Sequence, residues 1–222
     1  MGLRSRFVEG PSSLGARSRA RRWELLGRLF PHLPSYRVLD LGGTADSWLR
    51  AELQPKSVTV LNLHGNELVA GHEGEALPEW IELVAGDACE PPASVLAGDY
   101  DMVFSNSLIE HVGGAYRRRL LAGVIRAAAP RHWVQTPYRY FPVEPHYLFP
   151  GYQFLPVAGK AWLAQRWPLI HTRDADWAAG VGTALDVELV GATEMRYLFP
   201  EATLHRERLA GVTKSLVAVR TA

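Results

Sequence analysis

Short apolar runs alternate with amphipathic segments along most of the chain. Residues 115–129 repeat apolar side chains at helical spacing, with Tyr116, Leu120 and Val124 on one face. The apolar runs that read as buried strands are 36–41, 57–63, 81–87, 100–107 and 132–137. Near-continuous apolar strands that alternate with helices predict an α/β fold whose parallel sheet is covered on both faces.

The two ends of the chain carry different patterns. Residues 14–30 predict an amphipathic helix, and 46–53 predict a shorter one with Asp46 as its N-cap. Near the C-terminus, 201–209 and 214–220 predict two strands joined by a tight turn. The hairpin adds an antiparallel pair to five parallel strands, so seven strands are expected.

The segment after the fifth strand is rich in aromatic residues and prolines. Residues 133–168 hold ten aromatic residues and six prolines, which argues against one continuous helix or a central strand. We expect an N-terminal helical arm or lid (1–34) and one domain (35–222). Within that domain, 137–180 form an aromatic-rich insertion on the side where a substrate pocket is common.

Composition excludes several classes of protein. The 222 residues contain one cysteine, so neither an internal disulfide nor a cysteine-rich zinc site is possible. No apolar run approaches the roughly 20 residues that span a bilayer, and the start has no signal-peptide core. We therefore expect a cytoplasmic protein without a membrane partner. A net charge of +1 gives no global field for nucleic acid.

Polar residues follow each of the first four predicted strands. In an open α/β sheet, ligands bind at the carboxyl ends of the strands. Any one of these residues could simply cap a turn or lie on the surface, but four polar strand ends in succession indicate one long ligand across the sheet edge. They are Asp40, Gly42 and Gly43 after the first strand, Asn62 after the second, Asp87 after the third, and Ser105, Asn106 and Ser107 after the fourth.

The stretches "VLDLGG", "VTVLNL", "GDACE" and "YDMVFSNSLIEHV" resemble the class I S-adenosylmethionine-dependent methyltransferases, small-molecule type. The resemblance covers about Tyr36 to Pro137. It implies a Rossmann-like, doubly wound, mostly parallel seven-stranded sheet with a C-terminal antiparallel hairpin, and S-adenosylmethionine as cofactor. The implied cofactor-binding residues are Asp40, Gly42 and Gly43 at the methionine end, Asn62 and Leu63 at the ribose, Asp87 and Ala88 at the adenine, and Ser105 and Asn106 after the fourth strand. Asn106 and Ser107 would line the pocket below the sulfonium.

The chain departs from the family pattern at two places. Thr44 and Asp46 stand where later glycines of the turn are usual, and Asn62 stands where an acid usually binds the ribose. An amide can still donate and accept one hydrogen bond each. The competing ligand, a nicotinamide dinucleotide, is disfavoured because the last glycine of its fingerprint is replaced by Ser47.

The acceptor side offers three candidate catalytic residues. His111 is a candidate general base, or a histidine that holds its loop by a hydrogen bond. Glu144 and His146 lie two apart, so an extended chain would point both to one side, as an acid–base pair or a structural ion pair. Tyr138, Arg139 and Tyr147 are candidate substrate-binding residues. No close spacing supports a metal site among His111, His146, Glu144 and Asp101.

These patterns predict a methyltransferase that acts on a small organic acceptor, with oxygen favoured over nitrogen or carbon. Two alternatives remain. One is a non-catalytic cofactor-binding or scaffold protein on the same fold. The other is a nucleic-acid methyltransferase, which is disfavoured because "SNSL" replaces the Asn/Asp-Pro-Pro-aromatic motif after the fourth strand. The oligomeric state is open.

Overall fold

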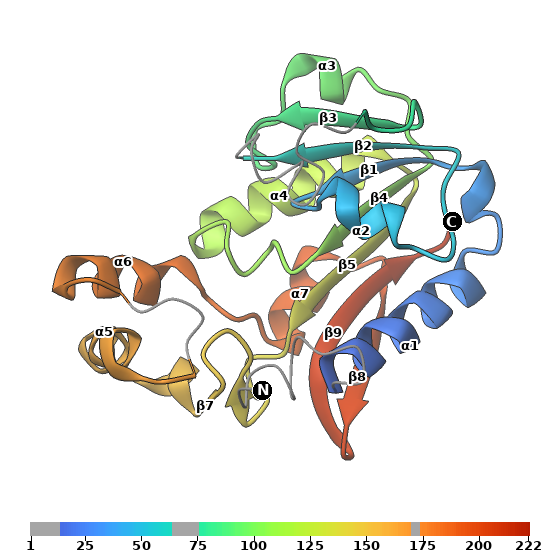
Figure 1. Cartoon of the computed structure of the whole chain (residues 1–222). Coiled ribbons are helices and arrows are strands. Elements are labelled where there is room, and N and C mark those ends of the chain that lie inside the picture. Colours follow the sequence, from blue (N-terminus) through green and yellow to red (C-terminus); the bar gives the residue numbers. More distant parts are fainter. Residues whose placement is uncertain (1–13, 64–75, 170–173) are drawn as a thin grey trace.

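A computed structural model describes residues 14–63, 76–169 and 174–222. Its centre is a seven-stranded sheet of order β3-β2-β1-β4-β5-β9-β8 (Figure 1). The strands are β1 (Arg37–Leu41), β2 (Ser57–Asn62), β3 (Ile81–Ala85), β4 (Met102–Asn106), β5 (Arg131–Pro137), β8 (Thr203–Leu209) and β9 (Val212–Arg220). β1 to β5 are parallel, and β9 runs antiparallel between β5 and β8. The predicted fold class is confirmed.

Helices cover both faces of this sheet. α1 and α2 pack on one face, while α3, α4 and α7 pack on the other (Figure 1). The helices are α1 (Leu14–Leu29), α2 (Ala45–Leu49), α3 (Ala93–Leu96), α4 (Gly114–Ala128), α5 (Val157–Arg166), α6 (Trp177–Asp186) and α7 (Ala192–Leu198). No helix within the described ranges is both long enough and apolar enough to cross a membrane.

Alternation along the strands supplies the two cores. On β1, Val38 faces the core beneath α1 and α2, while Leu39 and Leu41 face the core beneath α4 and α7. Trp48 of α2 and Trp133 of β5 are among the largest fully buried side chains. β1 and β4 pair with each other near the middle of the sheet. Successive strands are added outward on one side of β1 up to β3, and on the other side from β4 onward, so the strand order reverses between β1 and β4. The polar ends of these strands therefore meet at the usual ligand-binding edge.

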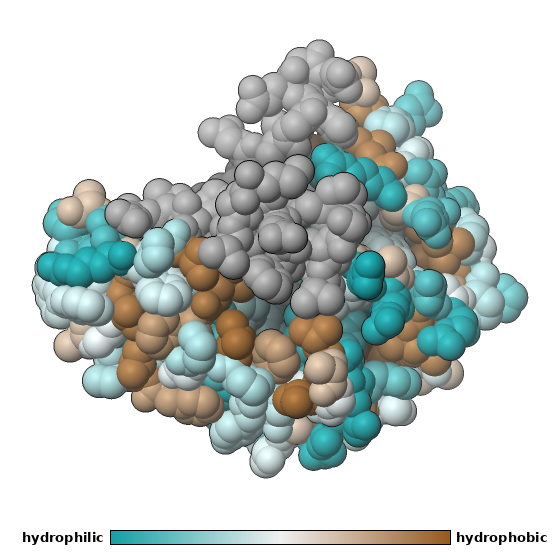
Figure 2. Space-filling view, turned by 60° about the horizontal axis from the view of Figure 1, so that its bottom comes forward, coloured by the Kyte–Doolittle hydropathy of each residue, from teal (hydrophilic) through white to brown (hydrophobic). Residues whose placement is uncertain are grey.

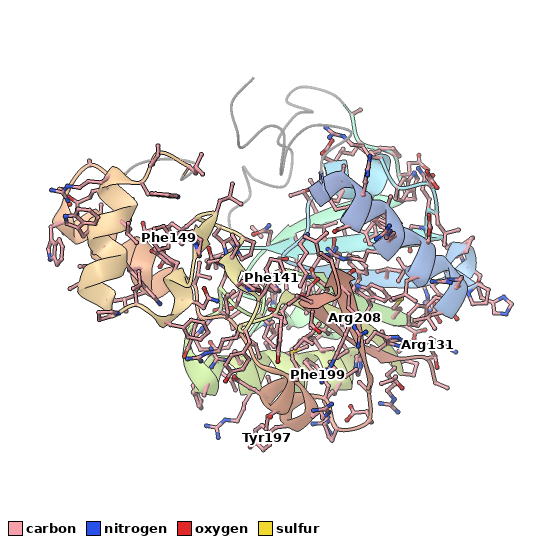
Figure 3. All side chains as sticks on the ribbon, turned by 90° about the horizontal axis from the view of Figure 1, so that it is seen from below. Arg131, Phe141, Phe149, Tyr197, Phe199 and Arg208 are labelled. Carbon is pink, nitrogen blue, oxygen red and sulfur yellow. The ribbon has the colours of Figure 1, made fainter. Side chains whose placement is uncertain are left out.

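α5 and α6 form a lobe away from the sheet (Figure 1). The lobe has a small core of its own, built on Tyr147, Tyr152, Leu163 and Ala164. Phe149 lies beside α5 (Figure 3) and meets the ring of Trp167 edge-on at 4.9 Å. Figure 2 shows apolar residues mixed with hydrophilic ones on this side of the molecule. The short strands β6 (Val143–Glu144) and β7 (Phe149–Pro150) and the 3-10 helix Tyr152–Phe154 complete the aromatic segment.

Some local expectations need correction. Asp46 is not the N-cap of the second helix, because Thr44 caps it by accepting a hydrogen bond from the Ser47 backbone. That helix also ends at Leu49 rather than near residue 53. The hairpin is as predicted, and its turn uses Ala210 and Gly211, both at positive φ. The helices α3, α5, α6 and α7 were not foreseen, and residues 1–13 of the predicted arm lie outside the described ranges.

Candidate functional site

The turn after β1 is tightly constrained. Gly42 has φ +80°, and its backbone N–H donates to the Leu61 carbonyl at 2.8 Å. A Cβ on Gly43 would overlap the carboxylate of Asp40. Asn62, at the end of β2, donates from its side-chain amide to the Gly43 carbonyl at 3.0 Å. These two glycines therefore let the backbone fold closely over Asp40, although the later glycines of the family pattern are missing.

Two cavities meet at Gly42. The first, which we call the strand-end cavity, has a volume of about 360 Å³. The second, which we call the helix-side cavity, has a volume of about 420 Å³. The residues that line the strand-end cavity include Gly42, Asn62, Leu63, Asp87, Ala88 and His111. The residues that line the helix-side cavity include Arg19, Trp23, Asp40, Gly42, Gly43 and Asn106.

Asp87 is held in place in the strand-end cavity. Both of its carboxylate oxygens accept hydrogen bonds from Nη2 of Arg117, at 2.8 and 2.6 Å, and one also accepts from the Cys89 backbone N–H. Burial alone would raise the pKa of Asp87, but these donors and the Arg117 charge hold it below its usual value. Asp87 is thus an ionised, oriented acceptor at the end of β3.

Two residues that line the helix-side cavity each carry a buried oxygen without a hydrogen-bond partner among the described residues. These oxygens are Oδ1 of Asp40 and Oδ1 of Asn106. The other oxygen of Asp40 accepts from Nε1 of Trp48 at 2.7 Å. Burial raises the pKa of Asp40 to about 7, and the Trp48 hydrogen bond offsets only part of that rise. Unpaired buried acceptors are costly, so this arrangement fits a donor-bearing or cationic ligand group.

Beyond β4 and β5, a cluster of carboxylates and imidazoles borders the strand-end cavity. The rings of His111 and His146 meet edge-on with centroids 5.0 Å apart. Nδ1 of His146 lies 2.6 Å from Oε1 of Glu144, whose other oxygen accepts from the Tyr147 backbone. Glu110 is fully buried, and its Oε2 accepts from the Thr136 hydroxyl at 2.9 Å. The fold therefore brings together all three predicted catalytic residues, together with Glu110.

The protein environment shifts the pKa of two groups in this cluster. Burial raises the pKa of Glu110 to about 7, against the opposing effects of nearby backbone, His146 and Thr136. Exclusion of water lowers the pKa of His111, although the ring is exposed at the cavity wall, and the charge of His146 lowers it further. Perturbed groups that gather beside a cavity are typical of functional sites.

Other predicted site residues lie elsewhere. Ser105 lines neither cavity, and its hydroxyl donates to the Leu41 carbonyl at 3.1 Å. Tyr147 is buried in the lobe, where its hydroxyl donates to the Thr183 carbonyl and its ring stacks on Tyr152 at 3.8 Å. Asp101 lies at the opposite end of β4 and accepts from the Arg37 backbone.

The remaining substrate candidates lie near the base of the lobe. Tyr138 is partly buried after β5, with its ring 5.5 Å from that of Tyr140. Arg139 lines a third cavity of about 140 Å³, together with Glu144 and Lys160. This cavity shares Glu144 with the cluster, so Arg139 is the substrate candidate that lies in a cavity beside it.

Sequence reasoning missed several residues of the site. Glu110 directly precedes His111 in "LIEHV", and that adjacency after a strand end was a readable signal. Arg117 projects from the first turns of α4 onto Asp87, which no sequence pattern indicates. Arg19 and Trp23 reach the helix-side cavity because α1 packs on the sheet beside α2.

Comparison with known proteins gives the fold. No protein-family model matches the chain, and no curated protein sequence does. A structure of magnesium protoporphyrin IX methyltransferase from Synechocystis PCC 6803 with bound SAH is 13% identical, covering 92% of this chain and 84% of that chain at a TM-score of 0.55. The structure of the N-methyltransferase NodS from Bradyrhizobium japonicum WM9 is 13% identical, and the match covers 91% of this chain and 95% of that chain at a TM-score of 0.52. The chain has the class I methyltransferase fold.

One similar structure carries a different description. A structure described as a putative Zn-dependent alcohol dehydrogenase from Rhodobacter sphaeroides is 13% identical to this chain, covering 91% and 96% at a TM-score of 0.55. Likeness at this identity establishes the fold, so the ligand has to be argued from the site.

Proposed function

We propose that the protein transfers a methyl group from S-adenosylmethionine to a hydroxyl oxygen of a small organic acceptor. The observation that carries this proposal is the pair of cavities that meet at Gly42, one with buried unpaired acceptor oxygens and the other with a fixed carboxylate. An elongated ligand with a cationic amino acid at one end and an adenosine at the other matches both.

The helix-side cavity suits the amino-acid end of this cofactor. Oδ1 of Asp40 and Oδ1 of Asn106 can accept hydrogen bonds from an ammonium group. Arg19 and Arg22 line the same cavity and offer positive charge to a carboxylate, although Arg22 already pairs with Glu207 at 2.8 Å. Each charged end of the amino acid therefore has a complementary partner.

The strand-end cavity suits the adenosine. Asp87 can accept from the exocyclic amine of adenine, and the apolar Ala88 and Leu63 can flank the base. Asn62 already donates to Gly43 and accepts from the Leu63 backbone at 2.7 Å. Its contact with the ribose therefore requires sharing those hydrogen bonds, which weakens ribose binding relative to a free acid.

A proton acceptor on the acceptor side supports the proposal of an oxygen acceptor. In the proposed transfer the acceptor oxygen forms a bond to the methyl carbon while the carbon–sulfur bond breaks. The electron pair of the broken bond stays on sulfur. The hydroxyl proton has to leave, and His111 at the cavity wall can accept it. Glu144 orients His146 beside it. Most of the rate comes from alignment of the two reacting atoms.

The first test is calorimetric titration of S-adenosylmethionine and S-adenosylhomocysteine into wild type, Asp40→Asn and Asp87→Asn. We expect one saturable site, weakened about tenfold or more in each variant, which is about 1.4 kcal/mol. Asp99→Asn serves as a control, because Asp99 is an exposed aspartate that pairs with Arg37 away from both cavities. Folded wild-type protein that binds neither compound would contradict the proposal and favour a scaffold role.

Asp40 adds a second readout. Because burial raises its pKa to about 7, part of the population is protonated at neutral pH, and an ammonium group next to it favours the ionised form. Binding should therefore release protons, measured as a dependence of the binding heat on the ionisation heat of the buffer at pH 7. Asp40→Asn should abolish that dependence.

The acceptor atom is tested by screening matched pairs of small phenols and anilines, with S-adenosylhomocysteine formation measured by mass spectrometry. We expect turnover with hydroxyl members of the pairs. Turnover restricted to amines would overturn the preference for oxygen while leaving methyl transfer in place.

A further inference from the structure

Glu110, His111 and His146 form a cluster of potential metal ligands. The proposed methyl transfer gives a chemical role to His111 alone. Each of the three residues offers one potential ligand atom, and these three atoms lie within 4.8 Å of one another. The residues come from two separate segments, the loop after β4 and the segment after β5. Because 34 residues separate His111 from His146 (146 − 111 − 1), no local spacing in the sequence reveals the group.

The buried carboxylate supplies an independent observation. Oε1 of Glu110 is buried and has no hydrogen-bond partner among the described residues, because the neighbouring Ser107 hydroxyl pairs with Oε1 of Gln135 at 3.1 Å and the Thr136 hydroxyl donates to Oε2 of Glu110. Glu110 itself is 0% exposed. A fully buried carboxylate oxygen without a partner is costly, and a cation is the partner that compensates it best.

His146 is arranged as metal-binding histidines usually are. Its Nδ1 is held by Oε1 of Glu144 at 2.6 Å, and Glu144 is in turn fixed by the Tyr147 backbone N–H. A carboxylate on one ring nitrogen orients the imidazole and raises the basicity of the other nitrogen, Nε2. Glu144 is thus a positioning residue in this arrangement.

We propose that Glu110, His111 and His146 bind a divalent transition-metal ion, and that this ion binds the acceptor hydroxyl. Two imidazoles and one carboxylate suit Mn²⁺, Fe²⁺, Co²⁺ or Zn²⁺ rather than Mg²⁺ or Ca²⁺, which prefer oxygen ligands. Three protein ligands leave coordination positions open for a substrate. Metal–ligand bonds of about 2.0–2.2 Å place neighbouring ligand atoms roughly 3–3.5 Å apart, so binding draws the three side chains together.

The inference rests on the proposed function and refines it. A cation at this place would lower the pKa of a bound hydroxyl, so its proton would pass to solvent before methyl transfer. With the ion bound, His111 is a ligand and solvent replaces it as the proton acceptor. The site borders the strand-end cavity through His111, which lines both. The cation would therefore hold the acceptor oxygen beside the cavity assigned to the cofactor.

The test is titration of MnCl₂ and ZnCl₂ into chelator-treated full-length protein, followed by calorimetry and by electron paramagnetic resonance for Mn²⁺. We expect one ion per chain and much weaker binding of MgCl₂. Glu110→Gln keeps the shape and the Thr136 contact but should lower affinity at least 100-fold. Glu144→Gln should lower it about tenfold, and the exposed His32→Ala, a histidine outside the cluster, should leave it unchanged.

Pulsed resonance of the wild-type Mn²⁺ complex gives a readout that needs no variant. Hyperfine coupling to two imidazole nitrogens is expected. Absence of binding, absence of nitrogen coupling, or equal affinity in wild type and folded Glu110→Gln would overturn the inference. Titration of S-adenosylhomocysteine into the same metal-free protein separates the two proposals. Cofactor binding without metal binding defeats only this inference. Metal binding without cofactor binding defeats the proposed function and the role of the ion in holding the acceptor, and leaves only the ion site.

Discussion

At the scale of single residues, the contact between Gly43 and the side chain of Asp40 constrains the turn after β1 more than the number of glycines in the turn does. Asp40 fills the space where a side chain on Gly43 would have to go. The turn therefore tolerates Thr44 and Asp46 in place of glycine, because those positions begin α2 instead of covering the buried carboxylate.

Gly43→Ala is expected to destabilise the protein by about 2 kcal/mol, because the new methyl group must displace a buried, hydrogen-bonded side chain. The matched control is Gly123→Ala, in the interior of α4, where a Cβ meets no atom within 4 Å. That change should stabilise by about 0.5–1 kcal/mol. Urea unfolding followed by circular dichroism measures both, and equal effects would refute the argument.

His132 has a less obvious residue-scale effect. It is fully buried in β5 against Phe199, with ring centroids 5.3 Å apart, and neither ring nitrogen has a hydrogen-bond partner among the described residues. Phe199 lies at the end of α7 (Figure 3). Burial, as the main cause, lowers the pKa of His132 to about 4. The folded protein therefore keeps this imidazole neutral where the unfolded chain protonates it.

The difference in proton binding at His132 between the folded and unfolded states sets how stability changes with pH. Between about pH 6.5 and pH 4 the unfolded chain binds a proton at His132 that the folded protein does not, so stability falls as the pH falls through that window. His132→Leu should remove this contribution, which totals about 3 kcal/mol across the window. Asp40 and Glu110 act in the opposite direction, so the difference between wild type and variant is measured at each pH. A difference that does not change with pH would contradict the prediction.

At the scale of elements, α4 does more than cover the sheet. Arg117 reaches from α4 to the end of β3 and fixes Asp87, and it also donates to the Val112 carbonyl at 2.6 Å. Arg118, next in sequence, is buried and pairs instead with Glu188 and Glu194 on the opposite side. Neighbouring arginines of one helix thus serve the cavity and the packing of α7 separately.

Arg117→Met should weaken binding of S-adenosylhomocysteine about tenfold, because Asp87 loses both hydrogen bonds from the guanidinium and is no longer oriented. Arg119→Met removes the same charge from an exposed position of the same helix and should leave affinity unchanged. Calorimetry compares the two. If they weaken binding equally, the effect is one of net charge and not of orientation.

Sequence patterns were sufficient for the sheet but not for the lobe. β1, β2, β3 and β4 are apolar runs that end in or are followed by polar residues, so their place, direction and ligand-binding edge could be predicted. α5 lies where prolines and aromatic residues obscure helical periodicity, and α6 holds Gly180 and Gly182, which are weak helix formers. Glu144 and His146 do lie together, but they meet across the turn that follows β6 and not along an extended chain as predicted. The approach of His111 to His146 depends on how the insertion folds back, which no local pattern encodes.

At the scale of the whole molecule, the protein has cores of unequal size. The sheet lies between two extended clusters of buried side chains, whereas the lobe has four buried residues in its own cluster. Local unfolding is easiest where buried apolar contact is least. The cluster residues Glu144 and His146 lie at the base of this lobe, so its opening and closing would move one wall of the proposed acceptor site.

Hydrogen exchange measured by mass spectrometry should therefore show peptides of α5 and α6 exchanging by local opening, at a lower free energy than peptides of β1, β4 and β5. A ligand bound at the cluster should slow exchange in the lobe more than in the sheet. Exchange of lobe and sheet with one common free energy would mean that they unfold as a unit.

The order of strands in the sheet has a consequence for how the protein is made. β5 ends at Pro137, but the strand that pairs with its outer edge, β9, begins only at Val212. While the ribosome synthesises the intervening residues, β5 presents an open row of backbone donors and acceptors beside the apolar Trp133 and Val134. The nascent chain thus passes through a stage in which pairing with another chain competes with its own completion, and chaperones that shield exposed strand edges should determine its yield.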